Sequence, residues 1–178
     1  MAEKESRGVN LTMDANNVYR EDVYTDRKVG TIRSLSVDTG KANWRFDQRA
    51  ATTALLATGG DLVFGGDVAG HFRAFDAKTG RVKWDVVIAD SDKGYWSTNA
   101  PLIVGNHVMV GVSGDFDNVA GQLKSVDAVT GETQWIFYST PPPGTPGAIS
   151  GGATGGQMWT TGTYDPELNL VFVGTGNP

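Results

Sequence analysis

The sequence of 178 residues contains no cysteine, which excludes disulfide bridges and thiolate metal sites but does not fix the compartment. No apolar stretch approaches the roughly 18 residues that a membrane-spanning helix needs. Residues 1–8 (MAEKESRG) are polar and hold no signal-peptide core. The formal net charge is −5 and no basic patch is present, which argues against nucleic acid as a partner.

Helical spacing of apolar residues is also missing from every long stretch, whereas glycine is abundant, with 24 residues. The chain is long enough for one ordinary domain with a real core. These features predict an all-β fold.

An eleven-residue pattern recurs along the chain and ends in a tryptophan each time. It occurs at residues 74–84 (AFDAKTGRVKW) and 125–135 (SVDAVTGETQW), and more weakly at 34–44 (SLSVDTGKANW), where Ser36 replaces the aspartate. We interpret it as a strand end, a turn and a second strand. Asp76 can cap the turn and Gly80 can adopt the positive φ that ends it. The flat ring of Trp84 can then cover the edge of a neighbouring sheet.

Short strands surround these repeats at the spacing of β-propeller blades, which consist of four antiparallel strands. The expected strands of one blade are 54–57, 62–65, 70–76 and 81–88, and those of the next are 99–104, 107–112, 122–127 and 132–138. A first module covers residues 30–46, and a final pair of strands covers 159–164 and 170–174. Residues 1–28 are expected to form a polar tail or loop. The loops at 90–97 and 113–121 are long, and binding residues concentrate in long loops.

The repeat resembles the tryptophan-docking motif of the quinoprotein alcohol dehydrogenases, a family of eight-bladed propellers that use pyrroloquinoline quinone (PQQ). Three further stretches match that family: residues 97–101 (STNAP), 112–118 (VSGDFDN) and 164–178 (YDPELNLVFVGTGNP). The resemblance covers residues 29–178 and implies a partial propeller, an incomplete ring of about three blades. Residues 30–84 resemble the closing blades of the family and 85–178 its early blades, so we expect a fragment, and one of mosaic order.

The resemblance assigns cofactor-binding roles to four residues. Trp159 matches the tryptophan that forms the floor under the PQQ ring, where a rigid aromatic plane suits a flat cofactor. Thr98 and Ser113 match hydroxyls that hydrogen-bond the cofactor, and Gly114 belongs to the same loop. The alternatives are an ordinary core position for Trp159 and blade-edge turns for the two hydroxyl residues.

Three residues are candidates for a site that binds Ca²⁺ or a lanthanide ion. Asn177 corresponds to a metal-binding asparagine, and its amide oxygen suits a hard cation. Many relatives have a glutamate ligand two residues after the glycine equivalent to Gly114, but Phe116 occupies that position. Asp115 or Asp117 would then supply the carboxylate. The alternatives are a Thr-Gly-Asn-Pro turn for Asn177 and a solvated acidic loop for the two aspartates.

The activity implied by the resemblance is oxidation of a primary alcohol to an aldehyde, with hydride transfer to PQQ and electrons leaving through a cytochrome c in the periplasm. The catalytic base of the family is not found in this chain, so we expect no turnover by the chain alone. Two alternatives stay open: a non-catalytic propeller scaffold or binding protein with the same repeats, and a truncated or recombined product without function of its own. His71 and His107 lie in expected strands and are interpreted as structural. Open blade faces predict self-association.

Overall fold

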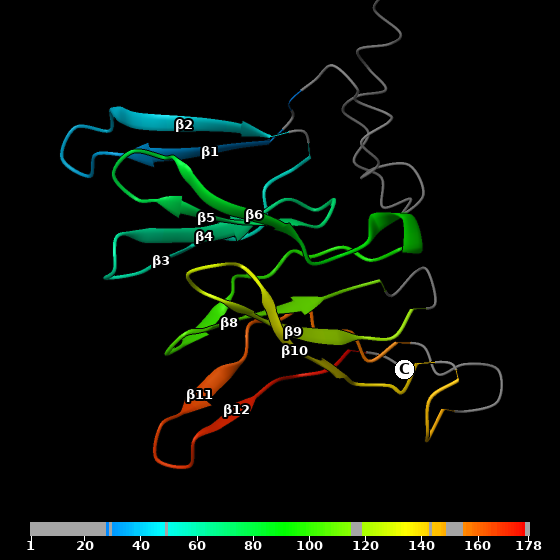
Figure 1. Ribbon diagram of the computed structural model, residues 1–178. Coiled ribbons are helices and arrows are strands. Elements are labelled where there is room, and N and C mark those ends of the chain that lie inside the picture. Colours follow the sequence, from blue (N-terminus) through cyan, green and yellow to red (C-terminus); the bar gives the residue numbers. More distant parts are fainter. Residues whose placement is uncertain are drawn as a thin grey trace, which may run out of the picture.

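A computed structural model describes residues 28, 30–48, 50–114, 119–142, 144–148 and 155–176. These residues form four antiparallel sheets that follow one another in chain order and stack face to face (Figure 1). The ring is not closed, because the first and last sheets lie at opposite ends of the stack. No helix in the described ranges is long and apolar enough to cross a membrane.

The two middle sheets are complete four-stranded blades. The first contains β3 (Leu56–Ala57), β4 (Leu62–Gly66), β5 (His71–Asp76) and β6 (Val82–Val87). The second contains β7 (Leu102–Val104), β8 (His107–Val112), β9 (Gln122–Asp127) and β10 (Thr133–Tyr138). A short 3-10 helix, η2 (Ser91–Lys93), lies between them. Each blade is an up-and-down meander, as expected for a propeller.

Each outer sheet is a hairpin of two strands. β1 (Gly30–Leu35) and β2 (Ala42–Gln48) form one end of the stack, and β11 (Thr163–Asp165) and β12 (Leu170–Phe172) form the other. The first hairpin carries the repeat and its tryptophan, so it corresponds to the last two strands of a blade. The second does not carry the repeat. Its strands correspond to the first two strands of a blade, as β3 and β4 do.

Two tryptophans join consecutive sheets in the same way. Trp44 Nε1 donates to the carbonyl of Ala77 at 2.8 Å, and Trp84 Nε1 donates to the carbonyl of Ala128 at 3.1 Å. Both acceptors lie in the turn of the next repeat. A Cβ on Gly80 would lie 2.7 Å from the Trp44 ring. The predicted packing of equivalent rings between blades is thus confirmed for these two tryptophans.

Trp135 departs from that prediction. It is 38% exposed, whereas Trp84 is 8% exposed, and the described residues provide no third turn for it to contact. The predicted exposed apolar sheet face is confirmed here, because all six residues of β10 are exposed.

The main hydrophobic core lies between the two complete blades. It joins Phe64, Phe72 and Trp84 of the first blade to valines of β8 and β9 in the second. A smaller core places Met109 and Leu123 against Met158 and β12. Neighbouring blades thus bury each other's faces, and these junctions contribute to stability alongside the blades themselves.

Several expected strands are shorter than the sequence indicated, among them 99–104, of which only Leu102–Val104 is a strand, and 170–174, of which only Leu170–Phe172 is a strand. Only Leu56–Ala57 of the segment 54–57 is a strand, and residues 159–162 are irregular, so Trp159 does not lie in a strand. Residues 155–159 instead lie against the second blade. Gly111 and Gly121 allow the main chain of this segment to approach closely, and a single bridge to Ala120 replaces regular strand pairing.

Candidate functional site

The segment 155–159 crosses the end of the second blade, where strand β8 and the following loop lie. Gly155 forms a parallel bridge with Ala120, and Gly121 N donates to Gly155 O at 2.9 Å. A Cβ on Gly111 would overlap the carbonyl oxygen of Met158. Glycine at position 111 therefore allows this segment to lie directly on β8.

Ser113 follows β8 and is fully buried. Ser113 N donates to Trp96 O at 2.7 Å, and Trp96 N donates to Ser113 O at 2.9 Å. Its side-chain Oγ is buried without a hydrogen-bond partner in the described part of the chain. A buried hydroxyl without a hydrogen-bond partner is unfavourable. The Ser113 hydroxyl is therefore able to form a hydrogen bond with a ligand.

Gln157 is fully buried beside the same loop. Its Nε2 donates to the carbonyl of Val119 at 2.6 Å, and its Oε1 is the other buried polar side-chain atom without a partner in the described ranges. Gly114 also contacts Val119, because a Cβ there would overlap the valine Cγ2. Val119 thus connects the loop containing Ser113 and Gly114 to the segment that leads to Trp159.

Trp159 is 52% exposed, so it is not an ordinary core tryptophan. Its indole lies on Gly176, where a Cβ would be only 2.9 Å from Nε1. Gly176 N donates to the carbonyl of Gln157 at 2.7 Å, which fixes this approach. The indole is therefore positioned at the residue that precedes Asn177, with much of its surface open to solvent.

Thr98 is exposed, and its carbonyl accepts from Ala54 N at 3.2 Å, so it lies at the junction of the two complete blades. Its neighbour Ser97 donates to the carbonyl of Gly111 at 3.1 Å, which places this segment along β8 as well. The structure thus gathers Thr98, Ser113 and Gly114 around the end of β8. The expected metal-binding residues Asp115, Asp117 and Asn177 lie outside the described residues, and within those residues no three acidic, histidine or cysteine side chains form a group able to hold a metal.

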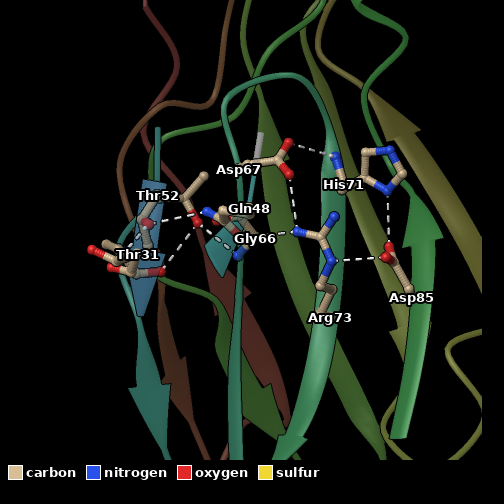
Figure 2. Close-up of polar contacts among 10 residues, drawn as sticks. Thr31, Gln48, Thr52, Gly66, Asp67, His71, Arg73 and Asp85 are labelled. Atoms are coloured by element: carbon tan, nitrogen blue, oxygen red, sulfur yellow. Dashed lines mark hydrogen bonds and ion pairs between the residues drawn. The ribbon is translucent and has the colours of Figure 1, made fainter. Parts of the chain in front are cut away.

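A second polar cluster lies in the first complete blade, centred on Arg73 (Figure 2). Arg73 Nη1 donates to Asp67 Oδ2 at 2.9 Å and to Gln48 Oε1 at 3.0 Å, and Arg73 Nε donates to Asp85 Oδ2 at 2.7 Å. The guanidinium lies 5.6 Å from the centre of the Phe46 ring. Gln48 and Phe46 belong to β2, so the cluster joins the first hairpin to the first blade.

His71 completes this cluster through a 2.9 Å contact between Nδ1 and Asp85 Oδ1. The hydrogen bond to Asp85 raises the pKa of His71 above its usual 6.5, against an opposing effect of burial. Burial alone would raise the pKa of Asp85, but hydrogen bonds from His71 and Arg73 outweigh it and leave the pKa lowered. The partners of His71 agree with its interpretation as structural. His107 similarly contacts Ser125 Oγ at 3.1 Å.

Neither Gln157 nor the Arg73 cluster was identified from sequence. Gln157 follows a glycine-rich run with no motif that marks a buried amide. The partners of Arg73 come from β2, β6 and the loop after β4, and only the folded blades bring them together.

The fold and these motifs define a propeller with tryptophan-docked blades, and comparison with known proteins gives its family. The family model for the outer membrane protein assembly factor BamB matches residues 15–170. The quinohemoprotein alcohol dehydrogenase ADH IIB of Pseudomonas putida is 31% identical over 93% of this chain and 28% of its own length. The lanthanide-dependent methanol dehydrogenase of Methylacidiphilum fumariolicum (strain SolV) is 34% identical over 69% of this chain and 24% of its own length.

Structure comparison agrees with sequence comparison. The solved structure of the quinohemoprotein alcohol dehydrogenase ADHIIG from Pseudomonas putida HK5 aligns with a TM-score of 0.73 and 30% identity, over 83% of this chain and 26% of that protein. The chain belongs to the PQQ-type propeller family that this family model defines, and its relatives are PQQ-dependent alcohol and methanol dehydrogenases. It spans about a quarter of the length of these relatives.

Proposed function

We propose that this chain is a portion of a PQQ-dependent alcohol dehydrogenase and supplies part of the cofactor platform. The observations that support this most directly are the half-exposed indole of Trp159, held on Gly176, and the buried hydroxyl of Ser113, which has no partner in the described ranges. A core tryptophan would be covered, and a purely structural serine would be hydrogen-bonded.

The residues present fit a flat, anionic, oxygen-rich cofactor. Trp159 would stack under its rings, and Ser113 Oγ would donate to one of its carboxylates or carbonyls. Thr98 would supply a second hydroxyl, and Gly114 would contribute through its main chain, because Val119 occupies the space of a side chain there. Bound PQQ would supply the hydride acceptor for oxidation of a primary alcohol.

The metal ligands complete the proposal. Asn177 and either Asp115 or Asp117 would bind Ca²⁺ or a lanthanide ion through oxygen atoms. In the whole enzyme, we propose a small alcohol as substrate, a cytochrome c as electron acceptor and the periplasm as location. This chain lacks an identified catalytic base, so it binds the cofactor without turning over substrate.

A second candidate function follows from the family model that matches residues 15–170, which is described for an outer membrane assembly factor. In that case the chain is a non-catalytic propeller scaffold, and Trp159 and Ser113 contact no cofactor. The two functions differ in a single measurable property, the binding of PQQ.

The test is titration of PQQ, with Ca²⁺ or La³⁺ present, followed by tryptophan fluorescence. We expect saturable quenching in the wild-type chain and its loss in Trp159→Ala. Trp135→Ala is the matched control, because Trp135 is also partly exposed but lies on β10, outside the segment 155–159. Equal quenching in the wild-type chain and both variants would remove Trp159 from the cofactor site. Alcohol-dependent dye reduction by the chain alone would contradict the proposed lack of turnover.

A further inference from the structure

One buried glutamine joins the two parts of the proposed cofactor platform. Gln157 is fully buried and lies two residues before Trp159, in the segment that crosses the end of β8. Its neighbour Met158 is also fully buried and packs with Met109 and Leu123 of the second blade. The segment is therefore held on this blade, and the contacts of Gln157 connect it to the chain on two further sides.

The side chain of Gln157 holds the loop that contains Ser113. Its Nε2 donates to the carbonyl of Val119 at 2.6 Å. Val119 packs on Gly114, because a Cβ on Gly114 would overlap the valine Cγ2 and would also lie 2.8 Å from the carbonyl oxygen of Gly94. The amide of Gln157 thus holds the residue that confines Gly114, and Gly114 follows Ser113 directly in the chain.

The main chain of Gln157 holds the residue that supports the Trp159 indole. The carbonyl of Gln157 accepts from Gly176 N at 2.7 Å. A Cβ on Gly176 would lie 2.9 Å from Trp159 Nε1 and 3.3 Å from Gln157 O, so the three residues are in close contact. A single residue therefore contacts the loop of the hydroxyl through its side chain and the support of the indole through its main chain.

Only the contact of the side chain depends on the residue being glutamine. The carbonyl of Val119 also accepts from Gly155 N at 3.1 Å, and this main-chain bond does not involve the residue at position 157. A carbonyl oxygen can accept two hydrogen bonds, and Gln157 supplies the second. Because a carbonyl cannot donate, the amide is oriented with Nε2 toward Val119. A leucine at position 157 would keep an apolar body there but would lose this bond.

We propose that Gln157 is a positioning residue that holds the Ser113 hydroxyl and the Trp159 indole in one arrangement for the cofactor. This inference rests on the proposed function, in which both groups contact PQQ. A flat ring that stacks on an indole and accepts from a hydroxyl needs the two partners at a fixed separation. Gln157 acts through these two residues, because its donor atom is already bonded to Val119.

The arrangement can be measured without a ligand, because a tryptophan lies on each side of it. Trp96 and Ser113 exchange two main-chain hydrogen bonds, so Trp96 reports on the loop and Trp159 on the indole itself. The chain has five tryptophans, and fluorine NMR of fluorotryptophan-labelled chain should resolve them once each is assigned by replacement with phenylalanine. We expect Gln157→Leu to shift the resonances of Trp96 and Trp159 and to leave that of Trp84 in place.

The matched control is Gln48→Leu. Gln48 is also buried, and its amide donates to the carbonyl of Gly66 and accepts from Arg73, so its loss removes comparable contacts at another junction. This variant should be less stable than the wild-type chain, with the Trp96 and Trp159 resonances unmoved.

Gln157→Glu tests the hydrogen bond with little change of shape. An ionised carboxylate places an acceptor against the carbonyl of Val119, whereas a neutral carboxyl can donate to it. Burial favours the neutral form, so acidification from pH 8 to pH 5 should return the Trp96 and Trp159 resonances toward their wild-type positions. Those of the wild-type chain should not move. Resonances in Gln157→Glu that do not respond to pH would contradict the inference even if Gln157→Leu failed to fold.

Equilibrium dialysis with PQQ and Ca²⁺ links the arrangement to binding. We expect Gln157→Leu to raise the dissociation constant of PQQ about tenfold and Gln48→Leu to leave it unchanged. Unmoved Trp96 and Trp159 resonances in Gln157→Leu, or moved resonances with wild-type binding, would overturn the inference. Failure of the proposed function is distinguishable, because quenching by PQQ would then be equal in the wild-type chain and Trp159→Ala.

Discussion

Two buried polar clusters lie in neighbouring blades, and they differ in whether their atoms have partners. Around Arg73, two carboxylates, a glutamine and a histidine are joined by hydrogen bonds of 2.7 to 3.0 Å. Around Ser113 and Gln157, two buried oxygens have no partner in the described part of the chain. The first cluster is organised for stability. The second keeps hydrogen-bonding capacity that a ligand can use.

The largest expected effect is the loss of Arg73. In Arg73→Met, the buried Asp67 loses its ion pair and Asp85 loses a hydrogen bond, so we expect a loss of about 3–5 kcal/mol in the free energy of unfolding. Denaturant unfolding measures this. The control is Arg81→Met, which changes an exposed arginine just before β6. It should alter the free energy of unfolding by about 0.5 kcal/mol at most. Similar small losses in both variants would show that the Arg73 cluster does not hold the first hairpin.

The next largest effect concerns the contact that brings Trp159 to the blade. Gly111→Ala places a methyl group on the carbonyl of Met158, and we expect a loss of about 1–3 kcal/mol together with a change in Trp159 fluorescence. Gly59→Ala is the control, because nothing lies within 4 Å of a Cβ at that glycine. A neutral Gly111→Ala variant would mean that the segment 155–159 does not depend on this approach.

How far the sequence alone predicts this molecule differs between fold and site. The sequence predicts strands 107–112 and 122–127 with their observed bounds, because turn glycines lie close to both ends of each segment. The strand expected at 159–164 begins only at Thr163, since glycine contacts at 111, 121 and 156 position the preceding segment without a ladder. The exposure of Trp135 depends on which segments pack against β10 in the folded chain, and the local sequence does not show this. The cofactor and metal roles of Thr98, Ser113, Gly114, Trp159, Asp115, Asp117 and Asn177 stay predictions.

A smaller effect is expected from pH, and it arises in the Arg73 cluster. The pKa of His71 is raised in the folded chain, so its ion pair with Asp85 contributes fully below the unfolded pKa of about 6.5. That contribution is lost as the pH rises through the higher folded pKa. Asp67, Arg73 and Asp85 are the charged groups nearest to it, and its partial exposure limits the effect to about 0.5 kcal/mol.

Thermal unfolding at pH 6 and pH 8 measures this contribution. The wild-type chain should exceed His71→Gln in stability by more at pH 6 than at pH 8. Lys124→Met is the control for a charged group outside the Arg73 cluster. Burial lowers the pKa of Lys124, which lies in the other complete blade, so this variant should not reproduce the pH dependence of His71→Gln. A difference that is constant with pH would show that the His71 charge does not contribute.

The comparison between the two clusters is tested most directly by Ser113→Ala, measured for both unfolding and PQQ binding. The variant removes a buried hydroxyl without a described partner, so the free energy of unfolding should be unchanged or slightly higher. It also removes a donor to the cofactor, so we expect PQQ binding to weaken about tenfold, or roughly 1.4 kcal/mol. Unchanged stability with weaker binding supports a ligand site at the end of β8. A loss of stability with unchanged binding would show that Ser113 is structural and would contradict the account.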